Sequence, residues 1–329
     1  APRYQARDTA IYYANQLGAK VVLGSATPSI ETYYNAMQNK FGYYHLKERF
    51  SEGALPQMII VDTKKQSEQS AILTPQLLEA IQSTVAKNKQ VILFQNKRGY
   101  APYMICETCG WIPHCKQCDV SLTLHKGKNM LSCHYCGAAY PVVHTCEACG
   151  KQSFKQKSFG TEQIETELVA LFPDHTVARM DQDTTRGKHA YKKLIDRLEN
   201  LEIDILIGTQ MLAKGLDFRN VGLVGVMNAD NLLNFPDFRA HERAYQLMVQ
   251  VSGRAGRSKK QGKVMIQTYN PYHQILQQVS TTDYTTMYKE QLQDRWQYHY
   301  PPYYRLVKIT LKHKDYAKVD LGINKQTGQ

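Results

Sequence analysis

The sequence predicts an α/β fold with a parallel sheet, interrupted by an inserted module that binds two metal ions. Short apolar runs typical of buried strands alternate with helical segments on both sides of residues 104–151. All eight cysteines of the chain lie between these two parts, within 44 residues. They form four Cys-x-x-Cys pairs: Cys106/Cys109, Cys115/Cys118, Cys133/Cys136 and Cys146/Cys149.

Helices and strands alternate before the cysteines. The apolar runs KVVLGSA at 20–26 and QVILFQN at 90–96 are typical of buried strands, and Pro75 suits the first turn of a helix. The predicted elements are a helix over 8–17, a strand over 20–26, a helix from 30, a strand over 57–63, a helix over 75–87 and a strand over 90–96.

The same alternation resumes after the cysteines, so the module is predicted to be an insertion at the end of strand 90–96. The apolar runs DILIGT and GLVGVMN again indicate buried strands. The predicted elements are a helix over 160–172, a strand over 176–181, a helix over 189–201, strands over 204–209 and 222–228, a helix over 239–251 and strands over 263–269 and 306–312.

Each cysteine pair supplies half of a tetrahedral zinc site, because two thiolates separated by two residues reach one ion. Gly110, Gly137 and Gly150 follow three of the pairs, and glycine adopts the left-handed backbone needed to turn past a metal. Eight thiolates complete two closed sites, which predicts two structural zinc ions. Nearby histidines are interpreted as surface or DNA-facing residues, namely His114, His125, His134 and His144.

Other interpretations of the cysteines stay open. Disulfides suit a secreted scaffold, but the sequence has no signal peptide and no cysteine outside the cluster. Iron in a rubredoxin-like site or an iron–sulfur cluster is an alternative to zinc. The four pairs also combine into two sites in three ways. Only five residues separate the first two pairs, which mildly favours a nested arrangement with the outer pairs together and the inner pairs together.

Composition points to a polyanionic partner. The net charge is +12 and the isoelectric point is about 9.2, which favours nucleic-acid binding. No apolar run reaches the roughly 20 residues of a membrane span, so we expect a soluble, cytoplasmic protein. The 329 residues suffice for two domains. The start at Ala-Pro-Arg without methionine and the polar end suggest an internal fragment of a longer protein.

Three motifs follow or precede predicted strands in a way that suits phosphate chemistry, because ligands of α/β sheets bind at the carboxyl ends of the strands. Residues 24–29 (GSATPS) offer hydroxyl and backbone N–H groups, and residues 208–215 (GTQMLAKG) add a lysine. Residues 250–257 (QVSGRAGR) end a helix with two arginines three residues apart, and arginines so placed suit a transferring phosphoryl group. Each motif alone also fits an ordinary turn, a solvated charge or a basic loop; the three together favour phosphate and nucleic-acid binding.

With these motifs the chain resembles the PriA family of replication restart helicases in superfamily 2. GSATPS resembles motif III, GTQMLAKGLDF motif V and QVSGRAGR motif VI of that family. The cysteine block, VILFQNKRGYAP at 91–102, NADNLLNFPDFRAHER at 228–243 and Tyr-Pro-Pro at 300–302 also match, so the resemblance covers about residues 3–316. It implies RecA-like domains, and an ATP-dependent 3′ to 5′ DNA helicase that restarts stalled replication forks and initiates primosome assembly.

The resemblance also implies a division of the chain. It implies the end of a first RecA-like lobe over 1–68, the start of a second lobe over 69–103, a zinc-binding insertion over 104–151, the rest of the second lobe over 152–282, and a helical linker with the truncated start of a C-terminal domain over 283–329. Its partners would be forked and single-stranded DNA, single-stranded DNA-binding protein and other primosome proteins, and its cofactors two Zn²⁺, ATP and Mg²⁺.

Residue roles follow from the same resemblance. The nested arrangement gives one zinc to Cys106, Cys109, Cys146 and Cys149, and the other to Cys115, Cys118, Cys133 and Cys136. At the ATP γ-phosphate, the catalytic residues would be Arg254 and Arg257, supported by Gln250. Nucleotide binding would add Gly215 and Asp217. The residues that contact DNA would be Ser25, Thr27, Arg98, Tyr100, Thr209, Gln210 and Lys214.

The chain departs from the family in three ways. Leu216 stands where many members have histidine, and Ser252 where alanine is usual. Neither a Gly-x-x-x-x-Gly-Lys-Ser/Thr loop nor an Asp-Glu-x-His sequence occurs, and in the family both lie upstream of the part that matches. We therefore expect the isolated chain to bind DNA without hydrolysing ATP at the rate of a motor.

Two functions of other classes remain as alternatives. One is a zinc-ribbon nucleic-acid adaptor without motor activity, and the other is an enzyme of different chemistry on a similar fold. The tyrosines near the end of the chain either stack on bases or pack a domain junction, and packing is the preferred interpretation for Tyr298, Tyr300, Tyr303 and Tyr304.

Overall fold

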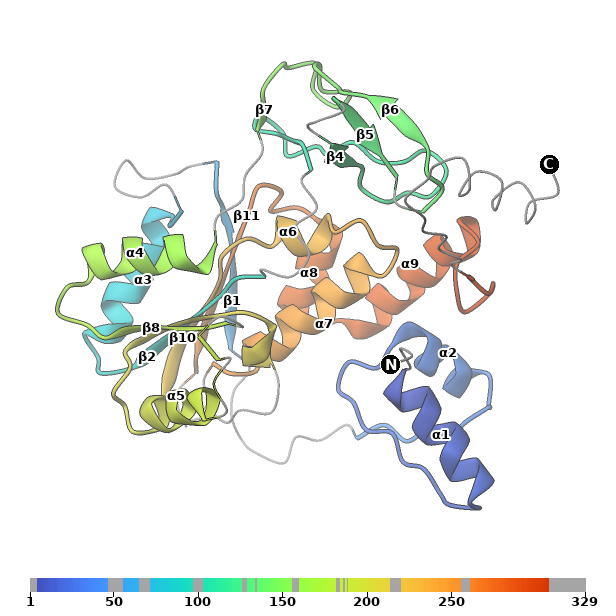
Figure 1. The fold of residues 1–329 in the computed structure, drawn as a ribbon, viewed down its shortest axis with the longest axis horizontal. Coiled ribbons are helices and arrows are strands. Elements are labelled where there is room, and N and C mark those ends of the chain that lie inside the picture. Colours follow the sequence, from blue (N-terminus) through green and yellow to red (C-terminus); the bar gives the residue numbers. More distant parts are fainter. Residues whose placement is uncertain are drawn as a thin grey trace.

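A central parallel sheet carries helices on both faces, and a small module of antiparallel strands lies beyond one end of it (Figure 1). The computed structural model describes residues 5–46, 56–64, 72–96, 103–125, 129–133, 135–155, 160–181, 184–185, 187, 189–213, 220–255 and 261–307. Among the helices of these residues, none combines the length and the apolar character needed to span a bilayer.

The sheet has six strands in the order β1-β11-β10-β2-β9-β8, and every neighbouring pair is parallel. This confirms the predicted parallel α/β fold. The strands are β1 (Gln57–Asp62), β2 (Gln90–Phe94), β8 (Val177–Met180), β9 (Ile205–Gly208), β10 (Val221–Val226) and β11 (Lys263–Thr268). All five residues of β2 are buried, as expected for a central strand covered on both faces.

Two separate cores cover the two faces of the sheet. Leu77, Ile81, Ile164 and Leu168 of helices α3 and α4 fill one core, and residues of α5, α7, α8 and α9 fill the other. The helices around the sheet are α3 (Pro75–Val85), α4 (Thr161–Leu171), α5 (Ala190–Glu199), the 3₁₀ turn η2 (Gln210–Ala213), α6 (Asp230–Leu233), α7 (Ala240–Ser252), α8 (Gln274–Thr281) and α9 (Tyr284–Gln297).

Local sequence explains where α3 begins. The Thr74 side chain accepts a hydrogen bond from the Leu77 backbone N–H, and Pro75 occupies the first turn, where its missing N–H costs nothing. The helix ends at Val85, two residues before the predicted Lys87. The start of a helix is thus more sharply encoded here than its end.

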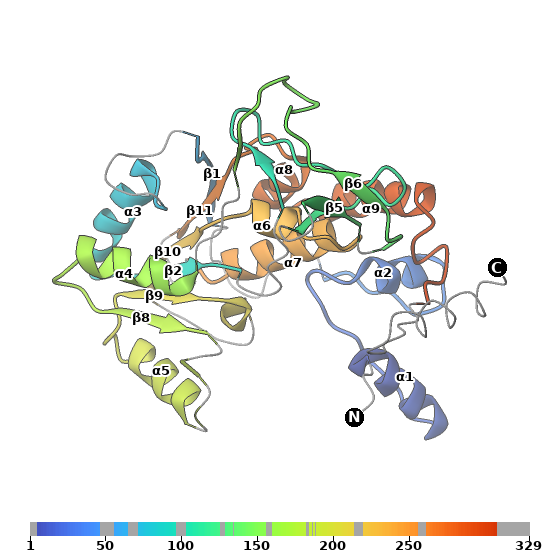
Figure 2. The same ribbon diagram turned by 45° about the horizontal axis from the view of Figure 1, so that its top comes forward.

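The cysteine module leaves the sheet after β2 and returns to it before α4, so it is an insertion, as predicted. At its base β3 (Ile105–Cys106) pairs antiparallel with β7 (Phe154–Lys155). Its outer part is an antiparallel sheet of three short strands, which are β4 (Thr123–His125), β5 (Met130–Ser132) and β6 (Ala139–Pro141). Figure 2 shows this module lying over α6, α7 and α8.

The strand predicted over 20–26 is not formed. Lys20–Ala26 has no regular secondary structure, and the Val22 side chain is 94% exposed. A strand requires a neighbour for its backbone hydrogen bonds, and none of the strands in the described residues lies beside this segment. The strand predicted over 306–312 is likewise absent at Leu306 and Val307, and its other residues lie outside the described ones.

The N-terminal segment forms two helices, α1 (Ala6–Gln16) and α2 (Ile30–Met37). Helix α2 lies beside α9 in both views, and α1 lies on the far side of α2 from α9 (Figures 1 and 2). Downstream of them, β1 pairs with β11 over six residues and forms one edge of the central sheet. Strand β1 falls within residues 1–68, the part that the resemblance gives to the end of a first lobe. Its backbone ladder joins it to β11 of the central sheet.

Candidate metal centres and motif contacts

All four Cys-x-x-Cys pairs form the same tight turn. The backbone carbonyl of the first cysteine accepts a hydrogen bond of 2.8–3.0 Å from the N–H group four residues later. That fourth residue has a positive φ in every pair, from 48° at Asp119 to 83° at Gly110. The left-handed backbone was predicted for the glycines at three of these positions, and Asp119 takes the same backbone conformation at the fourth. Aspartate is one of the few other residues that tolerate it.

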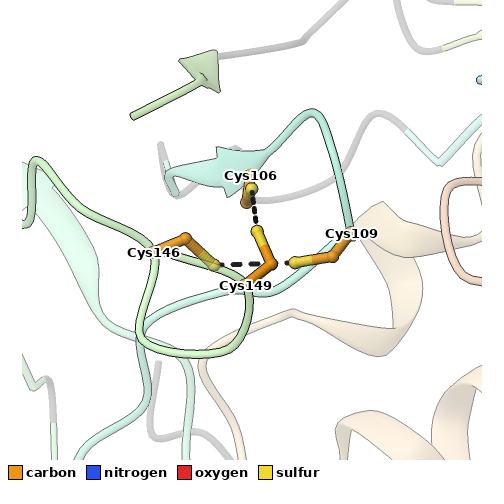
Figure 3. A group of neighbouring side chains, drawn as sticks. All are labelled: Cys106, Cys109, Cys146 and Cys149. Carbon is orange, nitrogen blue, oxygen red and sulfur yellow. Dashed lines mark hydrogen bonds between the residues drawn. The ribbon is translucent and has the colours of Figure 1, made fainter. Parts of the chain in front are cut away.

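The first cysteine site comprises Cys106, Cys109, Cys146 and Cys149, whose sulfur atoms all lie within 4.8 Å of one another (Figure 3). The Sγ atoms of Cys106 and Cys149 are 3.6 Å apart, and those of Cys109 and Cys146 are 3.5 Å apart. Zn–S bonds of about 2.3 Å in a tetrahedron place sulfurs about 3.8 Å apart. The four thiols therefore fit a zinc ion.

The second cysteine site comprises Cys115, Cys118, Cys133 and Cys136, again within 4.8 Å. Its closest cross-pair contact is 3.6 Å between the Sγ atoms of Cys115 and Cys136. The pairs are therefore nested, outer with outer and inner with inner. His114, His125 and His144 belong to neither group of sulfurs, and His134 lies outside the described residues.

The first cysteine of each site is prepared for the thiolate form that binds metal. Burial acts to raise the pKa of Cys106, but hydrogen bonds from the backbone N–H groups of Cys109 and Thr108 outweigh it and lower the pKa to about 7. Burial also acts to raise the pKa of Cys115, and there the Tyr140 hydroxyl and backbone N–H groups lower it to about 7. Closed four-thiolate sites of this kind hold structural zinc.

The first cysteine site docks on the carboxyl end of β11. Tyr103, Ile105 and Ile112 form an apolar cluster with Tyr269, the residue that follows β11. The Tyr103 hydroxyl also donates a hydrogen bond of 2.6 Å to Asn231 Oδ1 in α6. At Gly110 an added Cβ would lie 3.3 Å from the Tyr269 carbonyl oxygen, a tight contact that would require this turn or the end of β11 to shift slightly.

The second cysteine site docks on the segment after α9. The Tyr300 hydroxyl donates a hydrogen bond of 2.9 Å to the Cys118 carbonyl oxygen. Its ring stacks on Phe238, with centroids 4.4 Å apart and planes 6° apart, and Tyr135 meets both rings edge-on. Tyr303 packs edge-on against Tyr34. Tyr300 and Tyr303 thus pack a junction, as the preferred interpretation of these tyrosines predicted.

The 24–29 loop is held by one face of α7. Gln250 Nε2 lies 3.4 Å from Thr27 Oγ1, and Gln246 Nε2 donates to the carbonyl oxygens of Thr27 and Pro28 at 3.3 and 3.2 Å. One turn earlier, Glu242 Oε1 accepts a hydrogen bond of 3.0 Å from the Ile30 backbone N–H. Sequence reasoning missed Gln246 and Glu242. Gln246 lies four residues and Glu242 eight residues before Gln250, and this spacing was the available signal, because residues four apart share a helix face.

Two family models match the cysteine module and the part of the chain that follows it. The family "PriA DNA helicase Cys-rich region (CRR) domain" matches residues 115–141, and the family "Helicase conserved C-terminal domain" matches residues 151–259. The replication restart protein PriA of Bacillus subtilis is 43% identical over 326 residues, which is 98% of this chain and 40% of that protein. The chain belongs to the PriA family.

Other PriA proteins show the same extent of similarity. The replication restart protein PriA of Haemophilus influenzae is 41% identical over 318 residues, covering 96% of this chain and 43% of that protein. The Synechocystis PriA is 40% identical over 318 residues, covering 94% of this chain and 38% of that protein. The chain thus spans about two fifths of the length of these PriA relatives.

Some residues singled out from the resemblance to PriA lie in the described part of the chain. Thr27 and Gln250 are brought together, and Ser25 Oγ accepts a hydrogen bond of 3.1 Å from the Thr27 N–H. Thr209 is buried at the end of β9, and Gln210 Nε2 donates to Asn96 Oδ1 at 3.2 Å. The following residues lie outside the described ones: Arg98, Tyr100, Lys214, Gly215, Leu216, Asp217 and Arg257.

Proposed function

We propose that this chain is part of an ATP-dependent 3′ to 5′ DNA helicase that restarts stalled replication forks and initiates primosome assembly. The contact of α7 with the 24–29 loop is the observation that carries the proposal. A motor must connect nucleotide state to its grip on DNA, and α7 joins the loop before α2 to the GRAGR segment within one helix length. Membership of the PriA family supports the same function.

ATP chemistry is assigned to the end of α7. Arg254 follows that helix and is largely buried, and Arg257 follows three residues later. Two guanidinium groups stabilise the negative charge that develops on a transferring γ-phosphoryl group, with Gln250 supporting them from the last turn of α7. Gly215 and Asp217 contribute further nucleotide contacts in this proposal. The sequence contains no Gly-x-x-x-x-Gly-Lys-Ser/Thr, so Mg²⁺ and the other phosphates need residues from elsewhere in the parent protein.

DNA binding is assigned to the carboxyl edge of the sheet and to the 24–29 loop. Thr209 and Gln210 directly follow β9, and Lys214 comes one turn later in the sequence. Ser25 and Thr27 contact DNA from the 24–29 loop in this proposal, and the Thr27 side chain is hydrogen-bonded to Gln250 of α7. Arg98 and Tyr100 extend the same interface after β2 in the sequence. A net charge of +12 supports attraction to the phosphate backbone of forked and single-stranded DNA.

The two zinc ions are structural in this proposal. They fix a module that contacts α6 and the end of β11 through Tyr103 and the segment after α9 through Tyr300. A module held at two points is suited to keep a constant position while DNA or partner proteins bind its outer surface. Single-stranded DNA-binding protein and other primosome proteins are the proposed partners.

The proposed division of the chain is that 1–68 ends the first RecA-like lobe, 69–103 and 152–282 form the second lobe, 104–151 is the zinc insertion, and 283–329 begins the C-terminal region. The pairing of β1 with β11 supports one refinement. Within 1–68, β1 belongs with the sheet of the second lobe, and α1 and α2 remain with the first.

Arginine variants of the parent protein test the ATP assignment. Arg254→Ala and Arg257→Ala should each lower DNA-stimulated ATP hydrolysis by about 10³-fold while leaving DNA binding in place, because the charge is needed only in the transition state. Arg197→Ala is the matched control, since the exposed Arg197 lies in the last turn of α5 and pairs with Glu202, which follows that helix. Normal hydrolysis in both arginine variants would reject the assignment.

Two further measurements separate this proposal from a zinc-ribbon adaptor. Unwinding by the parent protein should require a 3′ single-stranded tail, and DNA affinity should change when a non-hydrolysable ATP analogue is added. An adaptor would show neither effect. The isolated chain should bind DNA without motor-rate turnover, and DNA-stimulated ATP hydrolysis by the purified chain would contradict that expectation.

A further inference from the structure

Arg295 lies at a junction of three segments that are far apart in the sequence. Its side chain is only 2% exposed and comes from the last turn of α9. One end of the guanidinium donates to Glu242 Oε2 of α7 at 2.6 Å. The other end lies 3.1 Å from Glu31 Oε1 of α2 and 3.2 Å from the Pro301 carbonyl oxygen. A single buried cation therefore connects α2, α7 and the segment after α9.

Both carboxylates beside Arg295 act on the start of α2. Glu31 lies in the first turn of that helix, and Arg239 Nη2 also lies 2.6 Å from Glu31 Oε1. Burial acts to raise the pKa of Glu31, but the charges of Arg295 and Arg239 outweigh it and lower that pKa. Glu242 binds Arg295 with one oxygen and the Ile30 N–H with the other. Arg295 thus contacts both of the carboxylates that meet the first turn of α2, whose N-cap is Ser29.

On its opposite side Arg295 meets the aromatic stack that covers the second cysteine site. Its Cζ atom lies 5.1 Å from the centroid of Phe238, within the range of a cation–π interaction. Phe238 stacks on Tyr300, whose hydroxyl donates to the Cys118 carbonyl oxygen. An unbroken series of contacts therefore runs from a metal-binding turn to Arg295 and on to α2.

A buried ion pair alone is weak support for a special role, because such pairs often contribute little to stability. The distribution of the contacts is more informative. The planar guanidinium of Arg295 directs separate N–H groups at two carboxylates on two helices and at a carbonyl oxygen. The single ammonium of lysine cannot reproduce this fork. The geometry fixes the relative orientation of three segments rather than strengthening one.

We propose that Arg295 is a positioning residue that makes the orientation of α2, and of the 24–29 loop before it, depend on the folded state of the second cysteine site. The proposal rests on the proposed function for its meaning in ATP-driven movement, but its structural content can be measured independently. Loss of the second metal would release Tyr300, then Phe238 and Arg295, and finally the N-terminus of α2. Loss of the first metal would leave this series of contacts in place.

Hydrogen exchange of the α2 amides tests the proposal in the zinc-loaded chain. Cys136→Ser, which removes one ligand of the second site, should speed exchange at Thr32–Met37 about tenfold, because local opening becomes easier. Cys149→Ser, its counterpart in the first site, should leave that exchange unchanged. Protected amides in β2 and β9 would verify that each variant is folded. Equal α2 exchange in wild type and Cys136→Ser, with one zinc lost, would overturn the proposal.

Two further variants test the route through Arg295. In Arg295→Lys, α2 should already exchange fast, and adding Cys136→Ser should produce a smaller further change than in wild type, since Arg239 also joins Phe238 to Glu31. Tyr300→Phe removes only the hydroxyl that binds Cys118 and should give a partial increase, whereas Tyr304→Phe, on an exposed neighbouring ring, should give none. If Arg295→Lys does not fold, Tyr300→Phe still tests the route. An unchanged exchange rate of the α2 amides in Tyr300→Phe would reject it.

ATP hydrolysis by the parent protein separates this proposal from the proposed function. Coupled α2 exchange in a parent protein that lacks ATP hydrolysis would leave the positioning role standing and remove the helicase assignment. Normal ATP-driven unwinding, together with an α2 exchange rate that is unchanged in Cys136→Ser, would leave the helicase assignment standing and remove the positioning role of Arg295.

Discussion

Gln250 Nε2 lies 3.4 Å from Thr27 Oγ1, a contact between residues 223 positions apart in the sequence. The same face of α7 also binds the carbonyl oxygens of Thr27 and Pro28 through Gln246. A loop without regular structure thus has its end fixed by side chains from a helix in the main body. Motif residues that look independent in the sequence form one hydrogen-bonded unit.

A double-mutant cycle tests whether Thr27 and Gln250 act as one unit. Thr27→Val and Gln250→Met should each lower the free energy of unfolding, because each leaves a polar atom of the other residue without its partner. The double variant should lose less than the sum, with a coupling of about 0.5–1.5 kcal/mol. Urea unfolding of the four proteins measures it. Strict additivity would show that the contact contributes nothing.

Alanine at Gly110 should be more harmful than alanine at Gly137. Both glycines have positive φ, of 83° and 74°, so alanine costs about 1–2 kcal/mol of backbone strain at either position. Only at Gly110 does the new Cβ also meet the Tyr269 carbonyl oxygen, at 3.3 Å. Gly110→Ala should therefore unfold at a lower urea concentration than Gly137→Ala at equal zinc occupancy. Equal midpoints would mean that the turn moves away from β11 freely.

Two partly buried histidines predict a loss of stability towards acid. Burial, with His114 nearby, lowers the pKa of His241 to about 4, and burial beside His241 lowers that of His273 to about 3. Below about pH 6.5 the unfolded chain binds protons that the folded chain does not, so stability falls with pH. The window runs from about 6.5 down to the folded pKa values.

Urea unfolding at several pH values between 7 and 5, with zinc content monitored, measures this effect. His241→Gln should flatten the dependence, whereas His144→Gln, on the exposed surface of the module, is the control. An unchanged slope in His241→Gln would show that other groups cause the acid sensitivity.

Zinc removal should unfold the cysteine module while the central sheet persists. Structural zinc contributes its binding free energy to folding, and the strands of the module are only two or three residues long. A chelator should abolish hydrogen-exchange protection at β4 and β5 and leave that of β2 and β9. If the chelator changes neither the circular dichroism spectrum nor DNA binding, this would argue against metal at these sites.

The sequence predicted the strands of the central sheet well, because each is a short apolar run bounded by polar or turn residues. QVILF of β2 and ILIG of β9 need no context to be recognised. The order of the strands was not predictable in the same way. Only the crossover connections decide that β2 lies between β10 and β9 and that β1 joins β11 at the edge.

The same reasoning failed at Lys20–Ala26 for a physical reason. Its pattern is that of a buried strand, but burial and pairing come from neighbours, and Val22 has none in the described part of the chain. The sequence also gave no sign of the strands of the module, since two or three residues carry no periodicity. Asp119 was missed because its position is recognisable only by analogy with the glycines of the other three pairs.

The role of Arg295 was missed for a different reason. An arginine in a helix of mixed charge looks like a solvated residue, and nothing in the local pattern of α9 predicts that Glu31 and Glu242 converge on it. Long-range ion pairs between helices depend on tertiary packing, which one sequence does not encode in its spacing.

The nested order of the two cysteine sites has a consequence for how the module assembles. Cys115 and Cys136 close a loop of 21 residues, whereas Cys109 and Cys146 close one of 37. Chain entropy favours the shorter loop by about 0.5 kcal/mol, and once it is closed, the outer cysteines are joined by a much shorter effective path. The inner site is therefore expected to close slightly more easily than the outer one, so that the first ion to bind brings the remaining cysteines closer together for the second.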